Sequence, residues 1–127
     1  MAVHWRIDHG ALRIFATAQG SVARPDIETY VTEVIAQGAA GYQVVFDMRA
    51  ASTSLSRRDV AALSQAAKDR QKHGRSDGRM ALVASSDAER EMGAYFADLT
   101  NHGRACRLFS SVEDAMAWLD QPPGSEG

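Results

Sequence analysis

The chain alternates short apolar segments with longer segments whose apolar residues recur every three or four positions, and this alternation constrains its fold most strongly. Residues 42–48 and 79–85 are compact apolar runs suited to strands that are covered on both faces. The segment after the first run places Val60, Leu63 and Ala67 on one side of a helix. Helices between successive strands favour parallel pairing, so the sequence predicts an α/β fold.

The first part of the chain adds an antiparallel element to this pattern. Residues 3–8 and 11–18 are short strand-like segments separated by a turn-like pair that ends in Gly10, which favours a β-hairpin. A helix is expected to begin around Pro25, because proline fits the first helical turn, and to end at Gly38.

Serine residues indicate where the remaining helices begin. Ser56 stands three residues before Asp59, which is the spacing of a capping box. The next helix is expected to be capped by Ser86 or Asp87, and the last helix opens at Ser111 after one more strand. The predicted order is β-β-α-β-α-β-α-β-α, with a single mixed β-sheet and helices packed on it.

Length and composition bound the organisation of the chain. Its 127 residues are enough for one core but too few for two ordinary domains, so we expect a single domain over residues 1–120. Residues 121–127 contain two prolines and are expected to form a disordered tail. The formal net charge of -2 argues against a general nucleic-acid binder. The sequence contains no run of 18 apolar residues, so no membrane span is predicted.

Cysteine and histidine give no sign of a catalytic or metal site. The single cysteine, Cys106, excludes an internal disulfide and fits a cytoplasmic location. The histidines show no pairing at metal-ligand spacing; they are His4, His9, His73 and His102. Phosphate-binding glycine motifs are also absent, so we predict no metal, no cofactor and no catalytic residues.

Three features together resemble a known family. They are Val-Val-Phe-Asp at the end of a strand (residues 44–47), a small polar segment leading to a helix that starts with serine, and a closing pattern Phe-x-x-x-Glu-x-Ala-x-x-Trp-Leu (residues 109–119). In these features the chain resembles the STAS domain superfamily, and more narrowly the bacterial STAS/SEC14-type, SpoIIAA-like proteins that include anti-sigma-factor antagonists. The resemblance covers about residues 3–119. It implies a STAS-type sheet and a non-enzymatic regulatory or protein-interaction module.

Antagonists in this family are switched by phosphorylation of a serine in an Asp-Ser-Ser-Gly-like motif. Counted from Asp47, the matching position in this chain is Ser56. Leu55 stands where an acidic residue is expected, and Arg57 and Arg58 replace Ser-Gly. These differences weigh against a phospho-switch, although a phosphate here would gain from the helix N-terminus and the two arginines.

Candidate residues for a protein interaction or a phospho-switch are Asp47, Ser52, Ser54, Ser56, Arg57 and Arg58. Each has a simpler structural interpretation. Ser56 can serve as a helix cap that contributes about 1 kcal/mol. Asp47, expected at the carboxyl end of a parallel strand, can accept hydrogen bonds from the N–H groups of residues 50–52. An enzyme, which would rest on Asp47 and the histidines, is the weakest hypothesis.

The alternative function is a small carrier that binds a lipid or another apolar ligand between helices and sheet, as structurally related lipid-binding domains do. Candidate pocket residues are Met92, Tyr95, Phe96, Met116 and Trp118, on the inner faces of the last two helices. Core packing explains the same residues. The sequence identifies neither the protein partner nor the ligand, and it leaves a homodimer open.

Overall fold

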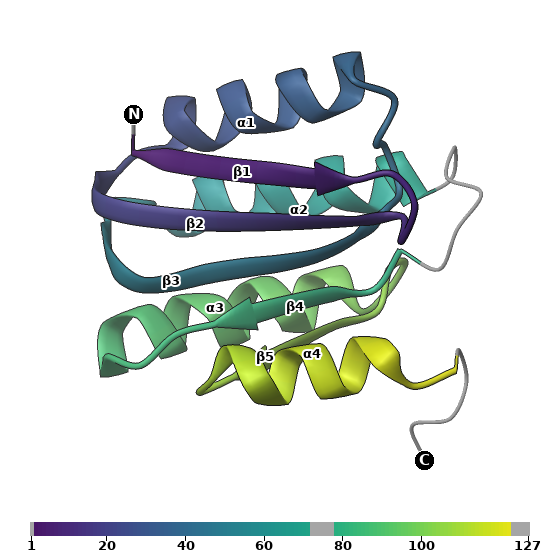
Figure 1. Cartoon of the computed structure of the whole chain (residues 1–127). Coiled ribbons are helices and arrows are strands. Elements are labelled where there is room, and N and C mark those ends of the chain that lie inside the picture. Colours follow the sequence, from purple (N-terminus) through teal and green to yellow (C-terminus); the bar gives the residue numbers. More distant parts are fainter. Residues whose placement is uncertain (1, 72–77, 123–127) are drawn as a thin grey trace.

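A computed structural model of the chain describes residues 2–71 and 78–122 (Figure 1). The elements in these residues are β1 (Val3–Asp8), β2 (Arg13–Val22), α1 (Arg24–Ala36), β3 (Gln43–Thr53), α2 (Arg57–Gln71), β4 (Met80–Val83), α3 (Asp87–Thr100), β5 (Cys106–Phe109) and α4 (Val112–Asp120). The predicted order and fold class are confirmed. The expected tail lies outside the described residues from residue 123 onward.

The strands form one mixed sheet in the order β1-β2-β3-β4-β5. β1 runs antiparallel to β2, which confirms the predicted hairpin, and the other neighbouring pairs are parallel. The register places Ile14, Val44, Met80 and Cys106 in one row across β2, β3, β4 and β5. Each parallel crossover carries a helix, as the alternating sequence pattern requires.

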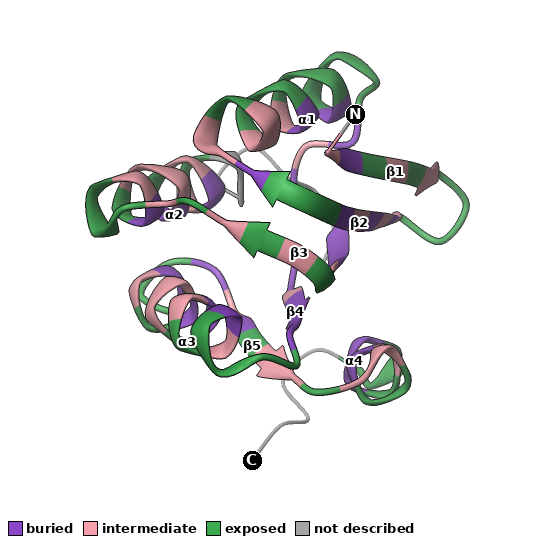
Figure 2. Cartoon of the chain, turned by 90° about the vertical axis from the view of Figure 1, so that its left-hand side faces the viewer, coloured by how far each residue is buried: buried purple, intermediate pink, exposed green. Residues whose placement is uncertain are grey.

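The helices cover the two faces of the sheet unequally. α1, α2 and α3 lie on one face and α4 on the other (Figure 2). Successive side chains of β3 point to opposite faces of the sheet. Val44 and Phe46 belong to the larger core, while Val45 packs with Trp118 of α4. The sheet is thus the common wall of two separate hydrophobic cores.

The predicted serine caps are confirmed. The hydroxyl of Ser56 accepts the N–H of Asp59 at 3.0 Å, and Ser86 caps α3 by accepting the N–H of Glu89 at 3.3 Å. Ser111 caps α4 in the same way. These bonds satisfy N–H groups that lack partners inside the first turn of a helix.

β3 is longer than the sequence predicts. The strand was expected to end at residue 48 and to be followed by a polar loop, but it continues to Thr53 because β2 also continues and supplies a parallel partner as far as Val22. The ladder contains a β-bulge, in which Met48 and Arg49 together lie opposite Ala18.

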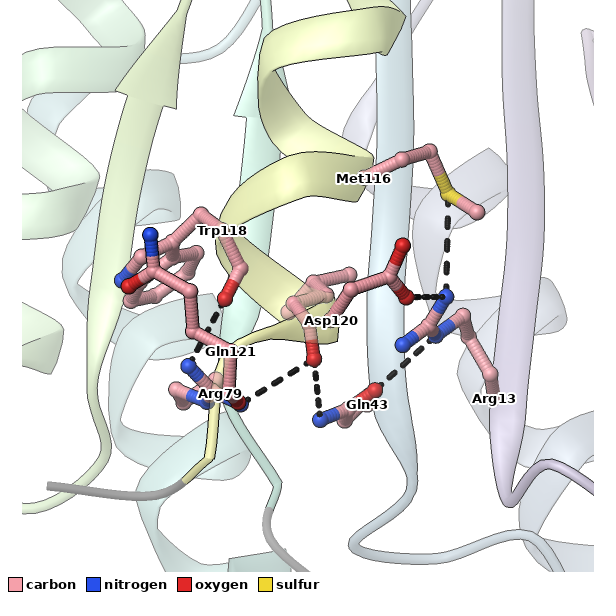
Figure 3. Close-up of polar contacts among 8 residues, drawn as sticks. Arg13, Gln43, Arg79, Met116, Trp118, Asp120 and Gln121 are labelled. Carbon is pink, nitrogen blue, oxygen red and sulfur yellow. Dashed lines mark hydrogen bonds and ion pairs between the residues drawn. The ribbon is translucent and has the colours of Figure 1, made fainter. Parts of the chain in front are cut away.

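A polar network fixes the end of α4 against the sheet (Figure 3). Arg79, which is buried, donates hydrogen bonds to the backbone oxygens of Trp118 at 2.9 Å, Leu119 at 3.1 Å and Gln121 at 2.6 Å. Gln43 donates to the carbonyl of Leu119, and Arg13 forms an ion pair with Asp120 at 3.1 Å. Cationic and amide donors at a helix C-terminus satisfy its last carbonyls and suit its dipole.

Candidate functional site

An apolar cavity of about 370 Å³ lies between α1, α2 and the sheet. Its walls include Ile27 and Val31 of α1, Phe46 of β3, Leu63 of α2 and Phe96 of α3. A cavity of this volume is within the range of small-molecule sites, which is about 300–1,000 Å³. Because its walls include residues of α1, α2 and α3, it lies on the face of the sheet that these helices cover; Figure 2 shows the three helices on that face.

Small side chains on α2 account for this hollow. α2 packs on α3, whereas α1 packs on β1. Where α2 faces the cavity it presents Val60 and Leu63 together with three alanines, Ala62, Ala66 and Ala67. The alanine side chains cannot reach across to α1, so the two helices flank the same part of the sheet without interlocking.

One end of the cavity has a polar rim of solvent-exposed side chains. Arg24 and Glu28 line it, and their side chains are 37% and 51% exposed. Arg24 forms one ion pair with Glu28 at 3.0 Å and another with Asp59 of α2 at 3.4 Å. Hydrogen bonds to Glu28 and Asp59 raise the pKa of Arg24. The pKa of Asp59 is lowered, mainly by the backbone N–H of Ser56.

Arg104 lies in the wall at the opposite end, where α1 and α2 finish. Its guanidinium is buried and donates to three carbonyl oxygens: Gly78 at 2.6 Å, Ala67 at 3.1 Å and Tyr42 at 2.8 Å. Arg104 therefore ties the end of α2 to the segments that precede β3 and β4. A single buried arginine with backbone partners leaves no pattern in the sequence, and sequence reasoning missed it.

The pocket residues predicted from sequence fall in three places. Two of them line the cavity, Met92 and Phe96. Tyr95 lies beneath the guanidinium of Arg57, whose carbon is 4.7 Å from the ring centroid. Met116 and Trp118 pack in the second core, on the opposite face of the sheet, because α4 returns over that face. They do not line this cavity.

The residues proposed for an interaction lie mainly where β3 ends and α2 begins. Five of them are exposed: Ser52, Ser54, Ser56, Arg57 and Arg58. The carboxylate of Asp59 accepts the N–H of Ser56 at 3.0 Å, which completes the predicted capping box. The sequence continues past α2 with two more basic residues, Lys72 and Arg75, which lie outside the described residues.

Asp47 lies within β3 and not at its end, which corrects the sequence expectation. Its carboxylate accepts the N–H of Arg49 at 3.0 Å and the guanidinium of the same residue at 3.0 and 2.8 Å. The expected donors were residues 50–52, but the bulge turns the N–H of Arg49 toward the carboxylate. The hydrogen bond from the Arg49 side chain lowers the pKa of Asp47.

Glu89 is a second polar residue that sequence reasoning missed. Its buried carboxylate accepts the N–H of Thr53 at 3.0 Å and the Thr53 hydroxyl at 2.8 Å. An acid three residues after the cap Ser86 is a capping-box signal, but here the acid binds the end of β3 instead. Glu89 thereby ties α3 to the strand that leads into the Ser56 segment.

Histidine and cysteine form no cluster in the described part of the chain. His9 shares a hydrogen bond of 2.9 Å with Tyr42, and His73 lies outside the described residues. Residues 2–71 and 78–122 contain no group of three or more His, Cys, Asp or Glu side chains that could hold a metal ion. No helix within these ranges is long and apolar enough to cross a membrane.

Comparison with known proteins gives a consistent picture. A family model described as SpoIIAA-like matches residues 13–120. A solved structure of an uncharacterised DUF3478-family protein with a SpoIIAA-like fold, from Shewanella loihica PV-4, is 19% identical over 93% of this chain and 92% of its own, with a TM-score of 0.60. The anti-sigma factor antagonist SpoIIAA in its unphosphorylated form is 14% identical over 93% and 97%, with a TM-score of 0.58. No curated protein sequence matches the chain.

Proposed function

Because the chain belongs to the SpoIIAA-like family, we propose that it is a non-enzymatic regulatory module whose ligand is an apolar molecule held between α1, α2 and the sheet. The SpoIIAA-like fold suggests a STAS regulatory or interaction module. The observation that carries the choice of ligand is the cavity, which is lined mainly by aliphatic and aromatic side chains.

The extent of the cavity supports an elongated ligand. Its walls extend from Ile27, near the start of α1, to Ala39 and Gly41 beyond its end. A helix of 13 residues is about 20 Å long at 1.5 Å per residue. An apolar space whose walls extend along the length of α1 can accommodate an alkyl chain, such as that of a lipid.

Native mass spectrometry of freshly purified protein, together with titration of the neutral fluorescent probe N-phenyl-1-naphthylamine, tests this proposal. The wild-type protein is expected to retain an apolar molecule or to bind the probe with a blue shift. Val31→Trp, which fills the cavity, is expected to abolish binding. Ala117→Trp is the matched control because Ala117 is exposed on α4, across the sheet. No retained molecule and no probe binding by the wild type would refute the proposal.

A second candidate function is the binding of a protein partner by the segment that joins β3 to α2. The exposure of Ser52, Ser54, Ser56, Arg57 and Arg58 favours it, because solvent-exposed side chains are accessible to a partner. A phosphate on Ser56 would meet the N-terminus of α2 and the two arginines, but also the carboxylate of Asp59.

This second function is tested by crosslinking in the cells of origin, followed by calorimetry with the purified partner. Arg57→Glu with Arg58→Glu is expected to weaken the complex, whereas Thr29→Glu, exposed on α1, leaves it unchanged. If Ser56→Glu and Ser56→Ala both leave the affinity unchanged, Ser56 is a helix cap and not a switch.

A further inference from the structure

The two helices that flank the cavity are joined by an ion pair at its solvent-exposed end. Arg24 stands in the first turn of α1, and Asp59 stands in the first turn of α2. Nη1 of Arg24 lies 3.4 Å from Oδ1 of Asp59. Since Arg24 also lines the cavity, its side chain extends over the rim between the two helices.

Both partners of this ion pair are held in place by other contacts. Nε of Arg24 bonds to Glu28 one turn along α1, which directs the rest of the guanidinium toward α2. Oδ2 of Asp59 accepts the N–H of Ser56, so Oδ1 remains available to Arg24. A carboxylate and a guanidinium that are positioned beforehand lose less conformational entropy when they pair.

We propose that the Arg24–Asp59 ion pair is a latch that controls how fast an apolar ligand enters and leaves the cavity. This inference rests on the proposed function, because it assigns a role to the rim of the same site. Opening the rim requires α1 and α2 to separate at their first turns, and the ion pair is the contact that must break. The latch closes over the free and the occupied cavity alike, so its loss speeds association and dissociation together and leaves the affinity unchanged.

The test is a double-mutant cycle read by stopped-flow fluorescence with N-phenyl-1-naphthylamine. Arg24→Met removes the charge and keeps an unbranched side chain. Asp59→Asn removes the charge and keeps an oxygen that can accept the N–H of Ser56, so the helix cap survives. Each single variant is expected to raise both rate constants about two- to fivefold, which is the factor for one exposed ion pair. The double variant is expected to be no faster than either single variant.

The salt dependence of the rate constants and a matched control variant test whether the ion pair itself is responsible. Because the probe is neutral, added salt acts on the latch and not on the charge of the ligand. Wild-type rate constants are therefore expected to rise with salt toward those of Arg24→Met, whose own rates stay constant. Arg49→Met removes an arginine from another exposed ion pair, on β3, and is expected to leave both rates unchanged. Circular dichroism confirms that each variant is folded.

The possible outcomes of this experiment distinguish failure of the latch proposal from failure of the proposed ligand-binding function. Failure of the wild type to bind any probe overturns the proposed function and the latch together. Binding with unchanged rate constants in Arg24→Met and Asp59→Asn overturns the latch alone. A rise in the dissociation constant through dissociation only, or additive effects in the double variant, also overturns it, because Arg24 would then be a contact of the ligand.

Discussion

Asp47 shows how a single carboxylate stabilises an irregular strand. The bulge in β3 turns the N–H of Arg49 away from the ladder, and the carboxylate two residues earlier accepts it. The guanidinium of Arg49 then closes over the same carboxylate. Both carboxylate oxygens of this candidate acid are thus bound by Arg49, one of them by its backbone N–H.

Asp47→Asn is expected to lower the free energy of unfolding by about 1 kcal/mol, because the amide oxygen keeps one hydrogen bond but loses the charge that strengthens it. Urea denaturation at neutral pH measures the change. Asp98→Asn, exposed on α3, is the control and is expected to have little effect. An equal loss in both variants would contradict the assigned role.

The same residue predicts a pH dependence. The pKa of Asp47 lies below its ordinary value of 3.8 in the folded state, so the carboxylate contributes stability that is present above 3.8 and is lost as the pH falls through the folded value. The difference between wild type and Asp47→Asn is therefore expected to shrink below about pH 4. A difference that stays constant in urea titrations across this range would show that the charge contributes nothing.

Cys106 is expected to be unreactive in the folded protein. It is 1% exposed, and burial raises the pKa of its thiol to about 12, so the thiolate that attacks a disulfide reagent is scarce at pH 8. Labelling with Ellman's reagent is expected only after unfolding, with a rate that rises along the denaturation curve. Rapid stoichiometric labelling of the native protein would contradict this expectation.

At the scale of elements, the features that depend only on residues close together in the sequence can be predicted. The caps Ser56, Ser86 and Ser111 follow from local spacing, and all three helices begin where the pattern indicates. The length of β3 does not follow from local spacing, because it depends on pairing with β2, about 30 residues earlier in the chain. The anchor of α4 could not be predicted either, since the partners of Arg79 are backbone carbonyls.

Arg79→Met is expected to loosen α4 and to lower the free energy of unfolding by about 2–3 kcal/mol, because it removes three hydrogen bonds that a charged guanidinium donates to carbonyls at the end of the helix. Urea denaturation measures the stability, and the red shift of Trp118 emission in a Trp5→Phe background reports the loosening. Arg107→Met is the control: its guanidinium also lies near the Trp118 ring, at 5.5 Å, but the residue is exposed. Similar losses in both variants would rule out a special role for Arg79.

At the scale of the whole molecule, the position of the cavity depends on how closely two apolar faces approach. The sequence predicts a pocket on the inner faces of the last two helices; Met92 and Phe96 of α3 do line the cavity, but beneath α4 the side chains form a packed core. Bulky rings fill such a space, and Trp118 packs against Phe109 with ring centroids 5.6 Å apart. The open volume extends from these α3 residues to the place where α2 presents alanines toward α1. Hydrophobic periodicity identifies an inner face but does not reveal the distance to the element opposite.

A cavity kept open by alanines implies that stability and binding oppose each other. Ala66→Leu fills part of the space and is expected to raise the free energy of unfolding of the ligand-free protein by about 0.5–2 kcal/mol. For the wild type, an apolar ligand at about 100 times its dissociation constant adds about 2.7 kcal/mol, and the variant is expected to lose most of that gain. Ala61→Leu, exposed on the same helix, is the control and should change neither quantity. Urea denaturation with and without N-phenyl-1-naphthylamine measures both effects, and a full ligand-induced gain in Ala66→Leu would place the bound molecule elsewhere.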